Sequence, residues 1–111
     1  MTFIKNSHIT YAIADGATIT PDSSLYTDVT ITAIAQNFTL ANPTGNPKNF
    51  QRLTIRIKDN GTPRTITFGS GYVQMGVALP TITITSKKMI LGFIYDAVSS
   101  KWGLVALTNE I

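Results

Sequence analysis

Few residues in this sequence have side chains that could carry out catalysis or bind a metal. His8 is the sole histidine, Glu110 is the only glutamate, and cysteine is absent. A Ser-His-Asp triad or a histidine metal site would therefore depend on one histidine beside the N-terminal end, with no acidic cluster next to it in sequence. The lack of cysteine excludes a thiolate zinc site and a disulfide framework. We expect no catalytic histidine and no metal.

The remaining acidic residues and the glycine-rich segment do not suggest an enzyme either. Glycoside hydrolysis needs a pair of carboxylates, but three of the five aspartates lie at predicted turns, where aspartate is common. Residues 69–71, Gly-Ser-Gly, lack the Gly-Lys-Ser/Thr sequence and the following helix of a phosphate-binding loop. We therefore expect a protein that is not an enzyme and has no cofactor.

Residues suited to binding a partner are easier to find. Arg52, Arg56 and Lys58 alternate with aliphatic residues and would form a basic row on one sheet face, although a solvated face gives the same pattern. A tryptophan such as Trp102 in an alternating strand belongs to a core more often than to a sugar-binding site. The candidate partner-binding residues are Phe3, Ile4, Lys5, Arg52, Arg56, Lys58, Tyr72 and Met75.

Length and composition restrict the class of protein. A chain of 111 residues is one domain, and its 14% of charged residues is well below the typical quarter. Part of such a weakly charged surface is expected to be covered by another subunit or a larger assembly. The net charge of +3 comes without a basic run, which argues against nucleic acid. No segment resembles a membrane helix or a signal peptide, so we expect synthesis in the cytoplasm and no membrane.

Residues 50–69 give the clearest structural pattern. Leu53, Ile55 and Ile57 alternate with polar and basic residues, which predicts a half-buried strand. Residues 59–63 contain Asn-Gly and a proline, so we expect a turn there and a second strand over residues 64–68, forming a hairpin.

Similar alternation predicts short strands along most of the chain. In residues 81–85 we expect Ile82 and Ile84 to point inward, and Met89–Asp96 is apolar on both faces, typical of a strand buried on both sides or at a subunit contact. Residues 69–79 are irregular and apolar, and should pack against a neighbouring subunit or over one end of the domain.

The predicted fold is all-β, an antiparallel β-sandwich or jelly-roll-like domain of about eight short strands, with an arm at residues 1–7 and one domain at residues 8–111.

Four segments resemble a domain that recurs in bacteriophage tail fibres and other virion proteins. They are LANPT at residues 40–44, the run at residues 51–58, RTITFGS at residues 64–70 and FIYDAVSSKW at residues 93–102. Their order is kept, and the resemblance covers roughly residues 15–107. It implies a phage virion structural protein, located on the capsid surface or the tail and commonly a homotrimer.

The resemblance leaves two functions open. The chain could be a capsid decoration or cement protein that binds the major capsid protein, or other virion proteins, on the head surface. It could instead be the receptor-binding tip of a tail fibre, with loops near residues 42–49 and 69–79 that contact a host surface glycan. A fibre tip usually ends a long chain, whereas this sequence starts at Met1 and holds one domain, so we favour decoration.

Overall fold

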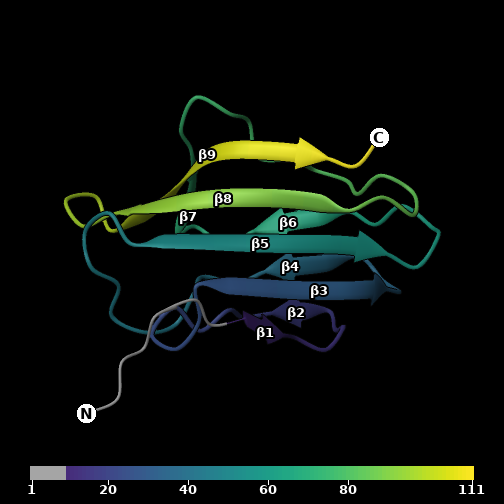
Figure 1. Ribbon diagram of the computed structural model, residues 1–111, viewed down its shortest axis with the longest axis horizontal. Coiled ribbons are helices and arrows are strands. Elements are labelled where there is room, and N and C mark those ends of the chain that lie inside the picture. The colour runs from purple at the N-terminus through teal and green to yellow at the C-terminus, as the bar shows by residue number, and fades with distance from the viewer. Residues whose placement is uncertain (1–9) are drawn as a thin grey trace, which may run out of the picture.

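The computed structural model describes residues 10–111, and this part of the chain contains nine strands and no helix (Figure 1). The all-β prediction is therefore confirmed for these residues, and none of them forms a helix that could cross a membrane. The strands are β1 (Thr10–Ala12), β2 (Thr18–Ile19), β3 (Asp28–Ile34), β4 (Phe38–Leu40), β5 (Arg52–Asp59), β6 (Ile66–Phe68), β7 (Tyr72–Gln74), β8 (Met89–Asp96) and β9 (Lys101–Asn109).

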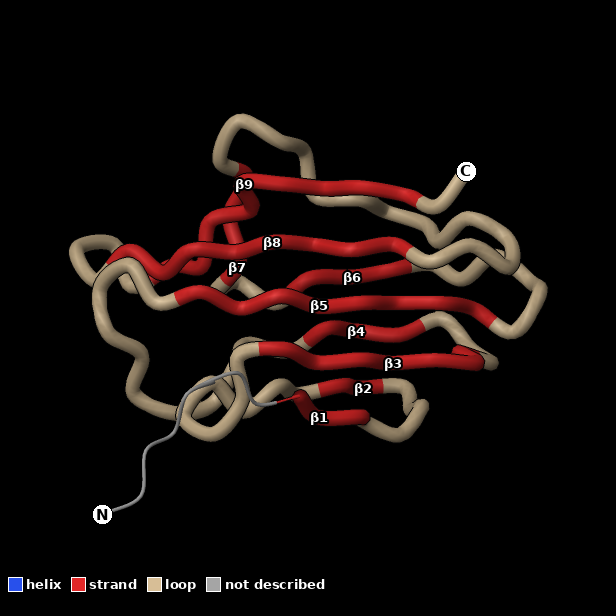
Figure 2. Tube along the Cα trace, viewed as in Figure 1, coloured by secondary structure: helices blue, strands red, loops and turns tan. Residues whose placement is uncertain are grey.

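The first six strands alternate between two sheets. Strands β1, β3 and β5 lie side by side in one sheet, and β2, β4 and β6 form the other, all of them parallel (Figure 2). Thr10 pairs with Asp28 and Asp28 with Thr54, so each pass of the chain adds one strand to each sheet. This is the stacking of coils found in β-helices.

The second part of the chain extends the larger sheet. Strand β8 pairs antiparallel with β5 and with β9, and β7 pairs parallel with β9, giving the order β1-β3-β5-β8-β9-β7. The predicted antiparallel pairing is thus right for the pairs β5–β8 and β8–β9. It is wrong for the pairs among the first six strands and for β7–β9, which are parallel. The predicted hairpin over residues 50–69 is also wrong, because β5 and β6 belong to different sheets and β6 pairs with β4.

Residues of both sheets contribute to one hydrophobic core. Leu53, Ile55 and Ile57 are fully buried, as their alternation predicted, and Trp102 also belongs to the core. In β8 the inward residues are buried while Ile90 and Ile94 are half-buried, so within one chain this strand is buried on one face only. A subunit contact on its other face remains a prediction.

Residues 81–85 are oriented opposite to the prediction. Ile82 and Ile84 are 52% and 43% exposed, whereas Thr83 is buried. The reason is a hydrogen bond of 2.7 Å in which the Thr83 hydroxyl donates to the carboxylate of Asp59, itself buried. Two backbone hydrogen bonds of 2.9 Å hold the segment against the start of β6: the Ile66 N–H donates to the Thr81 carbonyl, and the Thr83 N–H donates to the Arg64 carbonyl.

Candidate interaction surface

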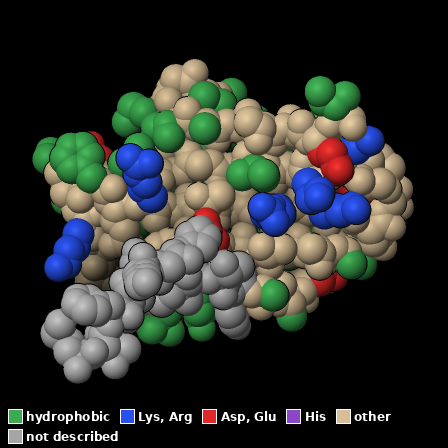
Figure 3. All heavy atoms as spheres, viewed as in Figure 1, with side chains coloured by type: hydrophobic (Ala, Val, Ile, Leu, Met, Phe, Trp, Pro, Cys, Tyr) green, Lys and Arg blue, Asp and Glu red, His purple; other side chains and the backbone are tan. Residues whose placement is uncertain are grey.

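The outer face of the six-stranded sheet carries most of the residues suited to partner binding. Outward residues of β5 are basic or hydroxylated, whereas those of the neighbouring β8 are aliphatic or glycine except for Asp96 at its end. Register places Arg52 beside Ile94 at one end and Arg56 beside Ile90 at the other. Arg52 and Arg56 are exposed and Lys58 is half-buried, so the predicted basic row exists on this face. Figure 3 shows this face, with few charged side chains over most of it.

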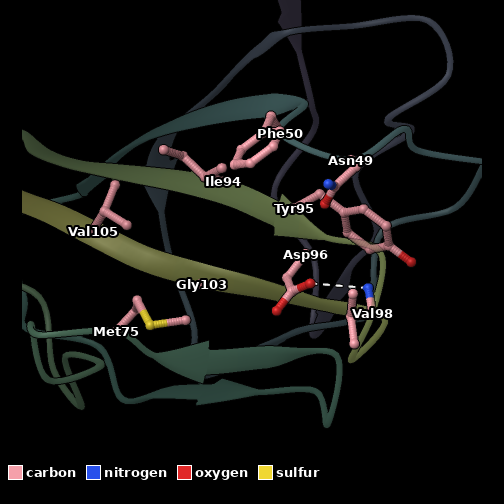
Figure 4. A pocket seen from close by; sticks show the side chains of 9 residues that line it. All are labelled: Asn49, Phe50, Met75, Ile94, Tyr95, Asp96, Val98, Gly103 and Val105. Carbon is pink, nitrogen blue, oxygen red and sulfur yellow. Dashed lines mark hydrogen bonds between the residues drawn. The ribbon is translucent and has the colours of Figure 1, made fainter.

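One end of this face holds an apolar groove with a volume of about 430 Å³. We call it the Phe50 groove, formed by Phe50, Met75, Ile94, Val98 and Val105 (Figure 4). Phe50 and Met75 flank strands β8 and β9 from opposite sides. Phe50 is 75% exposed and Val98 is 94% exposed, which is unusual for large apolar side chains.

The backbone holds Phe50 in its exposed position. Its N–H donates to the Tyr95 carbonyl at 2.9 Å, and its φ of 68° lies in the left-handed region, which is costly for a bulky residue. The Tyr95 ring packs on Trp102, with centroids 5.0 Å apart, and so connects the groove to the core.

Two polar side chains position the turn that carries Val98. Asn49 Oδ1 accepts the Ala97 N–H at 3.0 Å, and Asp96 Oδ1 accepts the Val98 N–H at 2.9 Å. The groove therefore has a fixed wall on this side.

The other end of the face holds a polar groove of about 320 Å³. We call it the Arg56 groove, formed by Arg56, Lys88, Ile90, Thr108, Asn109 and Glu110. The Lys88 N–H donates to Glu110 Oε1 at 3.0 Å, and this bond lowers the pKa of Glu110 together with the charges of Lys88, Lys87 and Lys58. Glu110 is therefore ionised and held among cations.

The other candidate partner-binding residues differ in whether the fold leaves them exposed. Met75 is half exposed and lines the Phe50 groove. Tyr72 is buried, its hydroxyl donates to the Ala41 carbonyl at 2.8 Å, and burial raises its pKa. Its predicted partner contact does not fit this fold, because the ring packs against Phe68 and Phe93 in the core. Phe3, Ile4 and Lys5 lie outside the described residues.

Sequence reasoning missed Phe50 and Val98. Phe50 only begins the pattern of residues 50–69, and Val98 lies within the phage-like segment at residues 93–102; neither was singled out as a binding residue. A weak signal for Val98 was present, since it is an aliphatic residue in a turn whose next residues are Ser99 and Ser100. Nothing in the sequence around Phe50 indicates a left-handed backbone.

The described residues include no group of three or more histidine, cysteine or acidic side chains that could hold a metal ion. No family model matches the chain, and no curated protein or solved structure is significantly similar to it. The two grooves are therefore the features from which a function must be argued.

Proposed function

We propose that this chain is a non-enzymatic structural protein of a bacteriophage virion, a decoration or cement protein that binds the head surface as a homotrimer. The observation that carries the proposal is the Phe50 groove, where large apolar side chains are exposed beside one another. Contiguous exposed apolar surface marks sites of protein association, since water contact with it is unfavourable.

The places of the phage-like segments support the assignment. Asn42, in LANPT, accepts the Gly71 N–H at 2.6 Å, and Gly71 directly follows RTITFGS. Lys101, in the last segment, donates to the Ser70 carbonyl at 2.6 Å. Pieces far apart in sequence thus form one unit in space. We also infer that the two sheets pack as a sandwich, with parallel coils in place of an antiparallel jelly roll.

Attachment follows from mass action. A protein that binds only the assembled shell stabilises that shell, increasingly so as its free concentration rises above Kd, and each bound copy adds contacts between neighbouring shell subunits. The outer face of the six-stranded sheet supplies the attachment surface. The major capsid protein is the proposed partner.

The experiment that tests this proposal compares wild type with Phe50→Gly in binding to purified heads that lack the chain. Glycine tolerates the left-handed φ, so the free energy of unfolding should change by no more than about 1 kcal/mol. Losing a ring that is buried on attachment should weaken binding roughly 30-fold.

Ile82→Ala is the matched control, because Ile82 is 52% exposed and lies outside the groove. It should bind heads like wild type. If Phe50→Gly remains folded and binds as tightly as wild type, the Phe50 groove is not the attachment site.

One observation favours the receptor-binding tip as the second candidate. A hollow of about 430 Å³ lies beside the loop at residues 42–49, and Tyr26, Asn46 and Lys48 are among its lining residues. An aromatic ring with amide and amine groups is suited to a sugar. Binding of the chain to host cells, but not to heads, would support this second function.

A further inference from the structure

The end of the sheet face opposite the Phe50 groove concentrates positive charge. Arg56, Lys58, Lys87 and Lys88 gather there around a single acidic residue, Glu110. The rest of the described chain holds four basic and five acidic residues, so the positive balance of the described residues comes from this cluster. Figure 3 shows blue side chains gathered with a red one on the right of this face. The sequence had suggested that charge is spread along the chain.

The Arg56 groove crosses three strands in register. Arg56 on β5 pairs with Ile90 on β8, and Ile90 pairs with Thr108 on β9. Half-buried Ile90 thus forms an apolar floor between exposed Arg56 and Thr108, with Lys88 and Asn109 also lining the groove.

The groove already binds one carboxylate of its own chain. Glu110 is fixed there through two bonds with the Lys88 backbone, one donated by each residue, at 3.0 and 2.8 Å. Four cations against this one carboxylate leave a surplus of positive charge. Arginine in particular recognises carboxylates through two parallel hydrogen bonds.

We propose that the Arg56 groove binds an extended acidic segment of a protein partner, whose carboxylates contact Arg56 and Lys88 and whose apolar side chains pack on Ile90. The lining residues favour this partner. No aromatic residue lines the groove, whereas sugars and single-stranded nucleic acids are bound largely by stacking on aromatic rings. This inference does not depend on the phage assignment.

The test uses the whole purified chain and a fluorescein-labelled peptide of alternating aspartate and leucine, with binding followed by fluorescence anisotropy. We expect saturable binding at about 20 mM salt that weakens at higher salt, because added salt shortens the range over which exposed charges attract each other. The double variant Arg56→Gln/Lys88→Gln should weaken binding about tenfold or more.

The matched control is Lys48→Gln/Arg52→Gln, which removes the same charge from exposed residues outside the groove. It should weaken binding less than about threefold, in keeping with a general charge effect. Circular dichroism confirms that each variant is folded. A second variant, Arg56→Glu/Lys88→Glu, should lose the aspartate peptide and gain binding to a peptide of alternating lysine and leucine.

Three results would overturn the proposal. The first is a wild type that fails to bind the acidic peptide at low salt. The second is an equal loss of binding in Arg56→Gln/Lys88→Gln and in the control Lys48→Gln/Arg52→Gln. The chain could also bind heparin or a thymidine oligonucleotide through Arg56 and Lys88 while ignoring the acidic peptide, which would assign the groove to another class of polyanion.

Discussion

At the scale of single residues, Asp59 explains the largest local difference between prediction and structure. Its buried carboxylate accepts hydrogen bonds from the Thr83 hydroxyl at 2.7 Å, the Ser86 N–H at 2.8 Å and the Gly61 N–H at 3.0 Å. Burial acts to raise the pKa of Asp59, but these bonds and the charge of Arg64 outweigh it, so the pKa lies below the ordinary 3.8. The carboxylate thus ties residues 83–86 to the end of β5.

Asp59→Asn should lower the free energy of unfolding at pH 7 by about 1–3 kcal/mol, because buried donors lose a charged acceptor. The pKa of Asp59 is lower in the folded chain than in the unfolded one. Its contribution to stability is therefore present above the unfolded value and is lost as pH falls through the folded value. Urea unfolding at a series of pH values should show a weaker loss of stability below about pH 4 in Asp59→Asn than in wild type.

Thr83→Val serves as the control for this residue. It removes the hydroxyl that donates to Asp59 and accepts the Arg64 N–H, but it keeps the carboxylate and the Ser86 and Gly61 N–H donors. It should therefore reduce stability, and its acid dependence should lie between that of wild type and that of Asp59→Asn. Equal stability of Asp59→Asn and wild type at pH 7 would contradict this role for Asp59.

At the scale of elements, one close approach holds the end of β4 against the segment between β6 and β7. The Asn42 side chain packs against Gly69 and Gly71, and Gly69 also donates its N–H to the Leu40 carbonyl at 2.9 Å. A Cβ at Gly69 would lie 2.9 Å from the backbone nitrogen of Asn42 and would also collide with its side-chain oxygen. Glycine is therefore required here by space.

Gly69→Ala should lower the free energy of unfolding by about 1–3 kcal/mol, since backbone must move to admit the methyl group. Gly16→Ala is the matched control: its Cβ would lie an ordinary 3.7 Å from the Thr18 carbonyl oxygen, and stability should change by less than about 1 kcal/mol. Urea unfolding of both variants measures the difference. A Gly69→Ala variant as stable as wild type would show that Asn42 can move away at little cost.

Strand positions could be predicted from the sequence, but strand partners could not. Alternation fixes which residues face the core, and it correctly predicted the inward residues of β5 and the bounds of β8. It does not state whether the neighbouring strand is parallel, and a turn such as residues 59–63 can lead to the same sheet or to the other one.

Among the site residues, the outward Arg52 and Arg56 were predictable from this alternation, whereas the exposure of Phe50 depends on a left-handed φ. Thr83 points inward only because Asp59 is there to accept its hydrogen bond.

At the scale of the whole molecule, the two grooves lie at opposite ends of one sheet face. One is apolar and the other is basic, so a single partner surface could contact both with apolar contacts at one end and carboxylates at the other. The three parallel coils and the β8–β9 hairpin give this face a rigid base of fully buried side chains. A rigid, preformed surface loses little entropy on docking, which suits the attachment proposed for this face.

The most direct test of the proposed virion function is the copy number and position of this chain in purified particles of a phage that carries its gene. Its gel band is quantified against the major capsid protein, and gold-labelled antibody locates it by electron microscopy. Decoration predicts many copies spread over the head. A few copies confined to the tail tip, or none in the particle, would contradict the proposed function.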